Sequence, residues 1–255
     1  MANKKIVARL DIKNEFVIKG LQLEGLRRVG GIFDVALQRE AEKVDEILLI
    51  DAVASLYGRQ AVVGAIAAAT ADTLIPITAA GGVKTLDDAK QLFGAGADRV
   101  AINSGALQNP NILKEVAGLF GAQSVVLSIE ARKVGSDDWR CFFNGGREDS
   151  GISVSDWLTQ IDPKFVGEIF VTAVDKDGLR RGPDISLLDR MESVTELPVL
   201  YSGGIESTKS AFDVLSRDHV SGIAIGAAFH YQSLVPTRLR QELLNLNLKL
   251  ARREV

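Results

Sequence analysis

Two acidic residues stand at the ends of two apolar runs of the sequence. Asp11 ends the run "KIVARLD", and Glu130 ends the run "SVVLSIE". Each run is typical of a buried strand, and functional residues of parallel α/β proteins gather at the carboxyl ends of their strands. Two facing carboxyl groups suit a general acid and a general base, so we predict that Asp11 and Glu130 form such a pair. The alternative is that either acid only caps the loop that follows it.

Glycine pairs follow two other apolar runs and precede helix-like segments, in "AAGGVKT" and "YSGGIES". Backbone N–H groups of such turns, beside a helix N-terminus, favour an anion such as phosphate. The small-residue loops "INSGA" and "IGAA", the second with Gly226 and Ala227, can complete two such sites. The sequence therefore predicts a substrate with a phosphate at each end and a reactive middle between the two acids.

Further acidic residues follow two more runs. Asp51 ends "EILLID", and "TAVDKDGLRRG" carries Asp175, Asp177 and Gly178. The second stretch is read either as a turn or as a contact to the substrate or its phosphates. The two histidines and the single cysteine have no spacing typical of metal ligands, so we expect neither a metal site nor a cofactor.

Eight strand-like runs alternate with eight helix-like segments along the whole chain. Parallel strands need a crossover between them, so this order predicts a single-domain (β/α)₈ barrel over residues 1–255, with an open doubly wound sheet as the alternative. Capping residues precede several helices, among them Thr85, Asn109–Pro110 and Ser207. The expected strands are residues 5–11, 46–51, 75–79, 99–103, 124–130, 168–173, 197–202 and 222–226, and the expected helices are residues 33–43, 60–72, 85–95, 111–120, 153–160, 184–194, 207–217 and 236–250.

The chain contains an internal repeat. "VDEILLID" is similar to "VGEIFVTA", and "IPITAAGGVKTLDDAKQLF" is similar to "LPVLYSGGIESTKSAFDVL", at the same separation in both cases. Asp11 and Glu130 lie at nearly that separation too. We therefore predict two duplicated half-barrels, at about residues 1–122 and 123–255, in which the two acids are one position in two copies.

Composition excludes several classes of protein. A net charge of −3 gives no electrostatic signature of nucleic-acid binding, and no apolar stretch is long enough for a membrane span. The residues at the N-terminus pass directly into a strand and do not form a signal peptide. We expect a soluble, cytoplasmic protein.

The chain resembles the cyclase subunit of imidazole glycerol phosphate synthase in four stretches: "LDIKNEFVIKG", "ITAAGGVKTLDDAKQLFGAGADRVAIN", "TAVDKDG" and "SGGIES". The resemblance covers essentially the whole chain. It implies a duplicated half-barrel that forms a heterodimer with a glutaminase subunit and receives ammonia from it. The ammonia cleaves and cyclises a bis-phosphorylated aminoimidazole carboxamide ribonucleotide to imidazole glycerol phosphate and aminoimidazole ribotide.

The resemblance also implies roles for individual residues. Asp11 falls on the first catalytic acid of the family, and Lys19 on a lysine at the barrel mouth. Asn144 falls on a loop position near the substrate. The residues implied at one phosphate site are Gly82, Asn103 and Ser104, and those at or near the other are Asp177, Gly178, Gly203 and Gly204.

At the opposite face, the family has a ring of ion pairs that gates ammonia. Lys5, Glu46, Arg99 and Glu168 fall on that ring, and Asp98 falls where the glutaminase subunit docks. The alternative is a salt-bridge plug that only seals the bottom of the barrel.

Two residues depart from the family pattern. The second catalytic acid is normally an aspartate and is Glu130 here, and a small uncharged residue is replaced by Arg9. By strand alternation Arg9 points into the barrel with Asp11, where a buried guanidinium needs an anionic partner. Such an ion pair lowers the pKa of the acid and weakens it as a base.

Three other functions are compatible with these residues. The chain is similar to a divergent branch of the family in the stretches "LEGLRRVGG", "ASLYGR" and "SIEARK". That branch works with a glutaminase in sugar amidation for surface polysaccharides such as lipopolysaccharide and nonulosonic acids. A non-catalytic glutaminase partner is the second alternative: neutralisation of the acids by Arg9 favours it, and the phosphate loops count against it. The isomerase of histidine biosynthesis shares the half-barrel, but the ring residues count against it.

Overall fold

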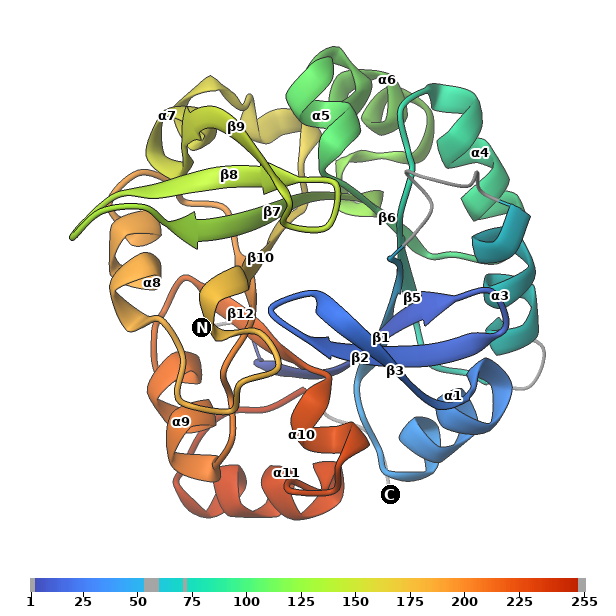
Figure 1. Ribbon diagram of the computed structural model, residues 1–255, viewed down its shortest axis with the longest axis vertical. Coiled ribbons are helices and arrows are strands. Elements are labelled where there is room, and N and C mark those ends of the chain that lie inside the picture. Colours follow the sequence, from blue (N-terminus) through green and yellow to red (C-terminus); the bar gives the residue numbers. More distant parts are fainter. Residues whose placement is uncertain (1–2, 53–59, 71–72, 252–255) are drawn as a thin grey trace.

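The chain folds into a closed barrel of eight parallel strands surrounded by helices (Figure 1). The computed structural model describes residues 3–52, 60–70 and 73–251, so the motif at 54–59 and the expected helical residues 71–72 lie outside the described part. Pairing of β10 with β7 closes the sheet. The barrel strands are β1 (Lys5–Lys13), β4 (Glu46–Asp51), β5 (Ile77–Ala80), β6 (Arg99–Ile102), β7 (Val125–Lys133), β10 (Glu168–Ala173), β11 (Val199–Ser202) and β12 (Val220–Ile225).

Helices follow the strands in the predicted order, which confirms the (β/α)₈ barrel. Their apolar faces and the outward side chains of the strands form one large core. The one-turn 3₁₀ segments are η1 (Ala122–Ser124), η2 (Pro163–Phe165) and η3 (Val174–Lys176). The helices are α1 (Ile32–Ala41), α3 (Gln60–Thr70), α4 (Leu86–Gly94), α5 (Ser104–Gln108), α6 (Asn111–Phe120), α7 (Val154–Gln160), α8 (Ile185–Glu192), α9 (Thr208–Leu215), α10 (Ala227–His230) and α11 (Pro236–Asn245).

The inside of the barrel has a separate apolar layer. Each of the eight barrel strands contributes one buried side chain to it. Burying such a side chain stabilises the fold by about 1.5–3 kcal/mol for the larger members. The layer separates polar groups at the two ends of the barrel and consists of Val7, Leu48, Ala80, Ala101, Val126, Phe170, Leu200 and Ala224.

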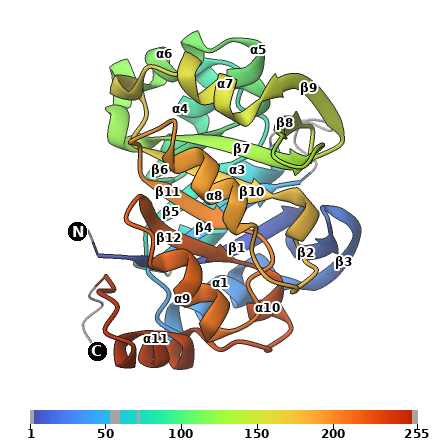
Figure 2. The same ribbon diagram turned by 90° about the vertical axis from the view of Figure 1, so that its left-hand side faces the viewer.

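Two antiparallel hairpins were absent from the sequence prediction. The first is β2 (Phe16–Leu21) with β3 (Glu24–Gly31), and the second is β8 (Trp139–Phe143) with β9 (Glu148–Ser153). They follow β1 and β7, at corresponding places in the two predicted halves, and both lie at the same end of the barrel (Figure 2). No helix in the described part of the chain has the length and apolar character needed to cross a membrane.

The hairpins correct the prediction that Asp11 and Glu130 end their strands. Asp11 pairs with Ile18 of β2, and Glu130 pairs with Phe142 of β8. Both strands continue because the hairpins supply hydrogen-bond partners beyond the rim of the barrel. The two acids therefore lie where each strand leaves the barrel sheet and enters its hairpin.

Candidate active site at the barrel mouth

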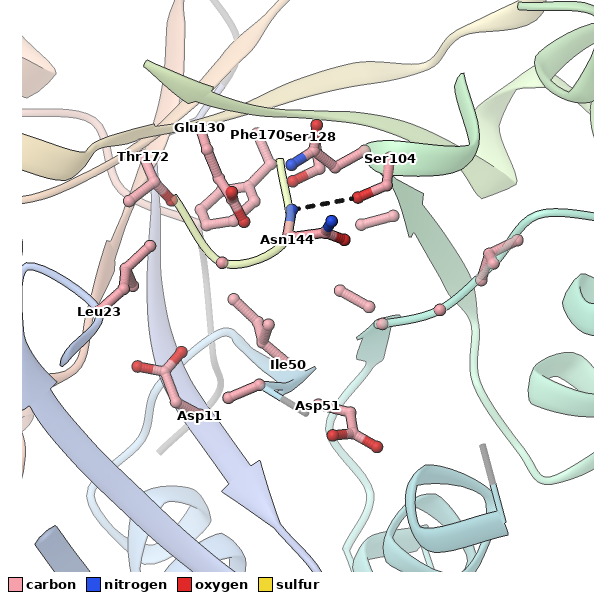
Figure 3. A pocket seen from close by; sticks show the side chains of 18 of the residues that line it. Asp11, Leu23, Ile50, Asp51, Ser104, Ser128, Glu130, Asn144, Phe170 and Thr172 are labelled. Carbon is pink, nitrogen blue, oxygen red and sulfur yellow. Dashed lines mark hydrogen bonds between the residues drawn. The ribbon is translucent and has the colours of Figure 1, made fainter. Parts of the chain in front are cut away.

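A pocket occupies the end of the barrel that carries the hairpins, and Asp11 and Glu130 both line it (Figure 3). The two acids come from strands on different sides of this pocket, and their side chains point into it. The structure thus brings the predicted pair into one cavity. Five other predicted site residues line the same pocket: Asp51, Gly82, Asn103, Ser104 and Asn144.

Glu130 is held by the turn between β8 and β9. The backbone N–H of Gly146 donates a hydrogen bond of 2.6 Å to Oε2 of Glu130. In the same turn the backbone N–H of Asn144 donates to the Ser104 hydroxyl at 3.5 Å (Figure 3). Burial raises the pKa of Glu130 to about 7, against the opposing effect of the Gly146 hydrogen bond. Glu130 is therefore suited to carry a proton near neutral pH.

Asp11 lies in a different environment, between two cations. Arg9 donates from Nε to Oδ1 of Asp11 at 2.8 Å, and Lys19 donates from Nζ to Oδ2 at 2.6 Å. Burial alone would raise the pKa of Asp11, but the charges of Arg9 and Lys19 outweigh it and hold the pKa well below its usual range. The ion pair expected between Arg9 and an acid is thus formed with Asp11.

Asp177 completes this group of charges. Its carboxylate accepts from Lys19 Nζ at 2.8 Å and from Arg9 Nη1 at 3.4 Å. Arg9, Asp11, Lys19 and Asp177 are together called the mouth cluster, and all four are almost fully buried. Lys19 was expected to contact substrate at the mouth, but it lines neither of the two glycine-lined pockets and instead bonds the two aspartates.

A second, smaller pocket lies beside the mouth cluster, near the ends of β11 and β12. Gly204 has a φ of +76°, and a Cβ on it would lie 2.1 Å from the carbonyl oxygen of Gly182. Only glycine fits this close approach of two loops. The predicted residues of the second phosphate site all line this pocket: Asp177, Gly178, Gly203, Gly204, Gly226 and Ala227.

In both helices that follow the glycine pairs, some of the N-terminal N–H groups are bonded within the chain. In α4 the carboxylate of Asp88 accepts from the backbone N–H groups of Lys84 and Thr85 at 2.8 and 2.7 Å. In α9 the Ser210 hydroxyl accepts from Ser207 N–H at 3.1 Å in the same way. These capping boxes use the N–H groups of the N-cap residue and of the third helical residue, and the N–H groups of the first two helical residues are not part of them.

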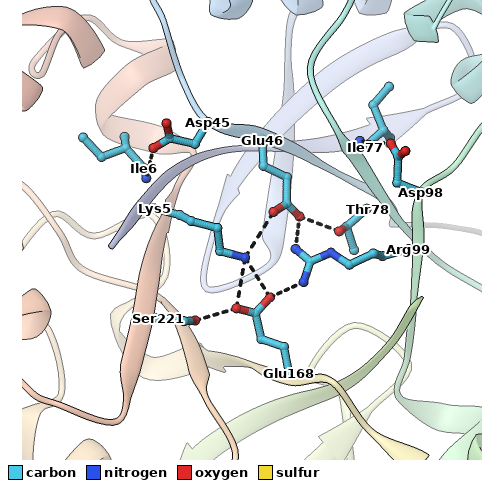
Figure 4. A network of polar contacts seen from close by, with 10 residues as sticks. All are labelled: Lys5, Ile6, Asp45, Glu46, Ile77, Thr78, Asp98, Arg99, Glu168 and Ser221. Carbon is cyan, nitrogen blue, oxygen red and sulfur yellow. Dashed lines mark hydrogen bonds and ion pairs between the residues drawn. The ribbon is translucent and has the colours of Figure 1, made fainter. Parts of the chain in front are cut away.

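At the opposite end of the barrel, four charged side chains form a closed ring (Figure 4). Lys5 Nζ lies 3.2 Å from the Glu46 carboxylate and 3.0 Å from that of Glu168, and Arg99 donates to both glutamates. The hydroxyls of Thr78 and Ser221 donate to Glu46 and Glu168. The structure therefore joins all four predicted ring residues.

Asp98 lies next to this ring and is exposed. Its Oδ2 accepts a hydrogen bond of 2.8 Å from the backbone N–H of Ile77 at the start of β5. Asp45 does the same for Ile6 at the start of β1, at 2.7 Å. Asp98 therefore holds the backbone at the start of β5. Its side chain is also exposed at the face where a partner is expected to dock.

Several pocket residues were not predicted. Ser128 precedes Glu130 by two positions in β7, so strand alternation places it on the same side and could have identified it. Thr172 pairs with Glu130 across β7 and β10. Leu23, Leu26 and Arg147 belong to the two hairpins, and the predicted strand boundaries gave no signal for them. Among the described residues, no three His, Cys, Asp or Glu side chains are grouped so that they could hold a metal ion.

Residues 5–235 match the protein family described as histidine biosynthesis protein. Three similar proteins carry the name imidazole glycerol phosphate synthase subunit HisF. That of Legionella pneumophila is 42% identical over 205 residues, which are 80% of this chain and 97% of that protein. That of Bacillus cereus strain Q1 is 33% identical over 249 residues, covering 98% and 99%, and that of Hydrogenobaculum sp. strain Y04AAS1 is 35% identical over 234 residues, covering 92% and 93%. The chain therefore belongs to the histidine biosynthesis protein family, together with these synthase subunits.

Proposed function

We propose that the chain is the cyclase subunit of an imidazole glycerol phosphate synthase. It would use ammonia to convert a bis-phosphorylated aminoimidazole carboxamide ribonucleotide to imidazole glycerol phosphate and aminoimidazole ribotide. The observation that carries this proposal is the mouth pocket, where Asp11 and Glu130 share one cavity with the glycine turn of Gly82. The names of the similar proteins support the same reaction.

The two pockets account for the two ends of such a substrate. One phosphate lies in the mouth pocket against Gly82, Asn103 and Ser104. The other lies in the second pocket against Gly203 and Gly226. Arg180 also lines this pocket, and its positive charge is opposite to that of a phosphate. The reactive middle then passes between Asp11 and Glu130, which act as the acid/base pair.

The ring at the other end of the barrel is proposed as the gate for ammonia. A glutaminase subunit docks on this face, where Asp98 is exposed, and forms a heterodimer with the chain. The ring of Lys5, Glu46, Arg99 and Glu168 is fully paired, so ammonia passes only when one ion pair opens. The complex works in the cytoplasm.

Arg9 favours a second candidate, the glutaminase-linked paralogue that delivers ammonia to a sugar. The guanidinium of Arg9, from β1, donates to Thr172 of β10 and Ser202 of β11. Its carbon lies 5.9 Å from the ring centre of Phe170, a member of the apolar layer. It lies in the path between the ring and the mouth pocket, and it engages one of the two acids. Both features fit a barrel whose substrate has changed while its phosphate loops remain. A chain that only supports a glutaminase, without chemistry of its own, is the third candidate.

The deciding experiment is turnover of the bis-phosphorylated ribonucleotide by the purified chain with ammonium salts, followed by loss of absorbance. Glu130→Gln is expected to be inactive, and Glu115→Gln, on the exposed surface of α6, serves as the matched control. Rapid cyclisation supports the synthase. Tight binding without turnover supports the sugar-linked paralogue, and absence of both contradicts the proposed substrate.

A further inference from the structure

Asp11 and Glu130 differ in how their charges are balanced. Both oxygens of Asp11 accept from cations, at 2.8 Å from Arg9 and 2.6 Å from Lys19. Glu130 instead accepts from a neutral backbone N–H, that of Gly146. No cation among the residues that the structure describes forms an ion pair with Glu130. The two acids are therefore unequal partners in any proton transfer.

The mouth cluster fixes Asp11 in its ionised form. It contains two cations and two anions, so its net charge is zero while Asp11 and Asp177 are both ionised. Exposure of these four side chains is between 1% and 5%, so water does not screen them. Adding a proton to Asp11 would leave Arg9 and Lys19 with a single anion, and an unbalanced buried charge is strongly unfavourable.

Arg9 is also anchored apart from the two aspartates. Its Nη1 lies 3.2 Å from the hydroxyls of both Thr172 and Ser202, on two neighbouring barrel strands. The guanidinium is therefore held in one orientation, with Nε directed at Asp11. A lysine or a small residue at position 9 could not make this set of contacts.

We propose that Glu130 alone exchanges a proton with the substrate, and that Arg9 is a positioning residue that holds Asp11 as a fixed anion. This division of roles rests on the proposed function and assigns to Glu130 alone the proton transfers that were proposed there for the pair. In its neutral form Glu130 donates its proton to the leaving group of the substrate. The carboxylate that results then takes a proton from the attacking nitrogen, which restores neutral Glu130. Asp11 gains no proton in either step and stabilises the positive charge that develops on the substrate.

The pKa shifts agree with this division. Burial raises the pKa of Glu130 to about 7, whereas the two cations keep the pKa of Asp11 far below neutrality despite its burial. The charged groups that share the pocket with Glu130 are Arg9, Asp11, Asp51, Lys84 and Arg147.

The test is a pH titration of the whole chain, labelled with ¹³C at the side-chain carboxyl carbons of aspartate and glutamate and followed by NMR. Loss of one signal in Glu130→Gln and of another in Asp11→Asn assigns the two groups. We expect Glu130 to titrate near pH 7, while the titration midpoint of Asp11 lies below its ordinary value of 3.8. A midpoint of Asp11 at or above 3.8, or titration of Glu130 at the ordinary glutamate value, would overturn the proposal.

Variants at position 9 separate positioning from a purely structural role. Arg9→Gln should raise the titration midpoint of Asp11, and Arg9→Lys, which keeps the charge, should restore part of the original shift. A purely structural Arg9 would lower the melting temperature in both variants and leave the Asp11 midpoint unchanged. If Arg9→Gln does not fold, the titration of the wild-type chain decides alone.

Kinetics connect the proton states to turnover. At constant free ammonia, kcat/KM for the bis-phosphorylated ribonucleotide should fall about tenfold per pH unit above pH 7, because the acid form of Glu130 is lost. A flat profile would contradict Glu130 as the proton donor. Absence of turnover together with the expected NMR titration would contradict the proposed substrate and leave the proton states of the two acids established.

Discussion

The backbone N–H of Gly146 lies 2.6 Å from Oε2 of Glu130, so a turn between two hairpin strands holds the acid of a barrel strand. The same turn carries Asn144, which contacts Ser104 after β6. Three successive residues of this turn, Asn144, Gly145 and Gly146, have positive φ angles of 53°, 71° and 73°. The orientation of Glu130 therefore depends on a backbone conformation that favours glycine.

Gly146→Ala should lower turnover about a hundredfold, because misplacement of a catalytic group by about 1 Å costs that much in rate. A Cβ at this position would lie 3.1 Å from Leu23 and 3.2 Å from Val174, in addition to the strained φ. Gly151→Ala is the matched control, since Gly151 has a φ of +75° and no atom within 4 Å of the added Cβ. Equal losses of activity in the two variants would contradict a specific role for the Gly146 contact.

Asp11→Asn should reduce turnover by about 10²–10³-fold while phosphate binding is retained, because the fixed negative charge beside the substrate is lost. The variant should also be less stable by about 3–5 kcal/mol, because Arg9 and Lys19 then share only Asp177. Steady-state kinetics, urea unfolding and ³¹P NMR with inorganic phosphate measure the three effects. An active Asp11→Asn enzyme would refute a role for Asp11 in the reaction.

The contribution of Glu130 to the stability of the chain should decrease as the pH rises from about 4.5 to about 7. An unfolded glutamate loses its proton near 4.5, whereas folded Glu130 keeps it to about 7, so folding takes up a proton between these values. The contribution of Asp11 to stability changes with pH in the opposite direction. It is complete at pH values above the ordinary aspartate pKa of 3.8 and is lost only at lower pH.

Urea unfolding of the wild-type chain and of Glu130→Gln, at pH 5 and at pH 8, isolates the effect of Glu130. The advantage of the wild type over the variant should shrink by about 1–3 kcal/mol between the two pH values. A difference that does not change with pH would mean that Glu130 ionises alike in the folded and unfolded chain.

Glu168→Gln should destabilise the chain by about 3 kcal/mol, since Lys5 and Arg99 each lose an anionic partner in a largely buried ring. Lys90→Ala is the control, because the Lys90–Asp87 pair is exposed and such pairs contribute under about 1 kcal/mol. Thermal and urea unfolding of the two variants provide the comparison. A Glu168→Gln protein as stable as Lys90→Ala would show that the ring makes little contribution to the fold and would favour its role as a gate.

The barrel was predictable because its strands are continuous apolar runs and its helices begin at recognisable caps. Thr85 and Ser207 both accept the predicted hydrogen bonds at the starts of α4 and α9. The hairpins were not predictable from the same signal. The side chains of β3 are mostly exposed or half-buried, so that strand has no apolar alternation.

The site was predictable where a glycine or an acid follows a strand, and less so where function depends on contacts between loops. The glycine turns at Gly82 and Gly204 line pockets as expected. The hydrogen bonds that Asp88 accepts from Lys84 and Thr85 were not predicted, because they depend on the rotamer of the Asp88 side chain. The ion pair of Arg9 followed from strand alternation, but its bonds to Thr172 and Ser202 depend on how the barrel closes.

The mouth pocket and the second pocket have no lining residue in common, and the buried charges of Arg9, Lys19 and Asp177 lie between them. This separation sets a minimum length for any ligand that fills both. If each pocket binds one phosphate, as proposed, two molecules with one phosphate each can bind at once. On that proposal, only a ligand long enough to pass over the charges binds through both of its ends, and the barrel would select its substrate by length as well as by charge.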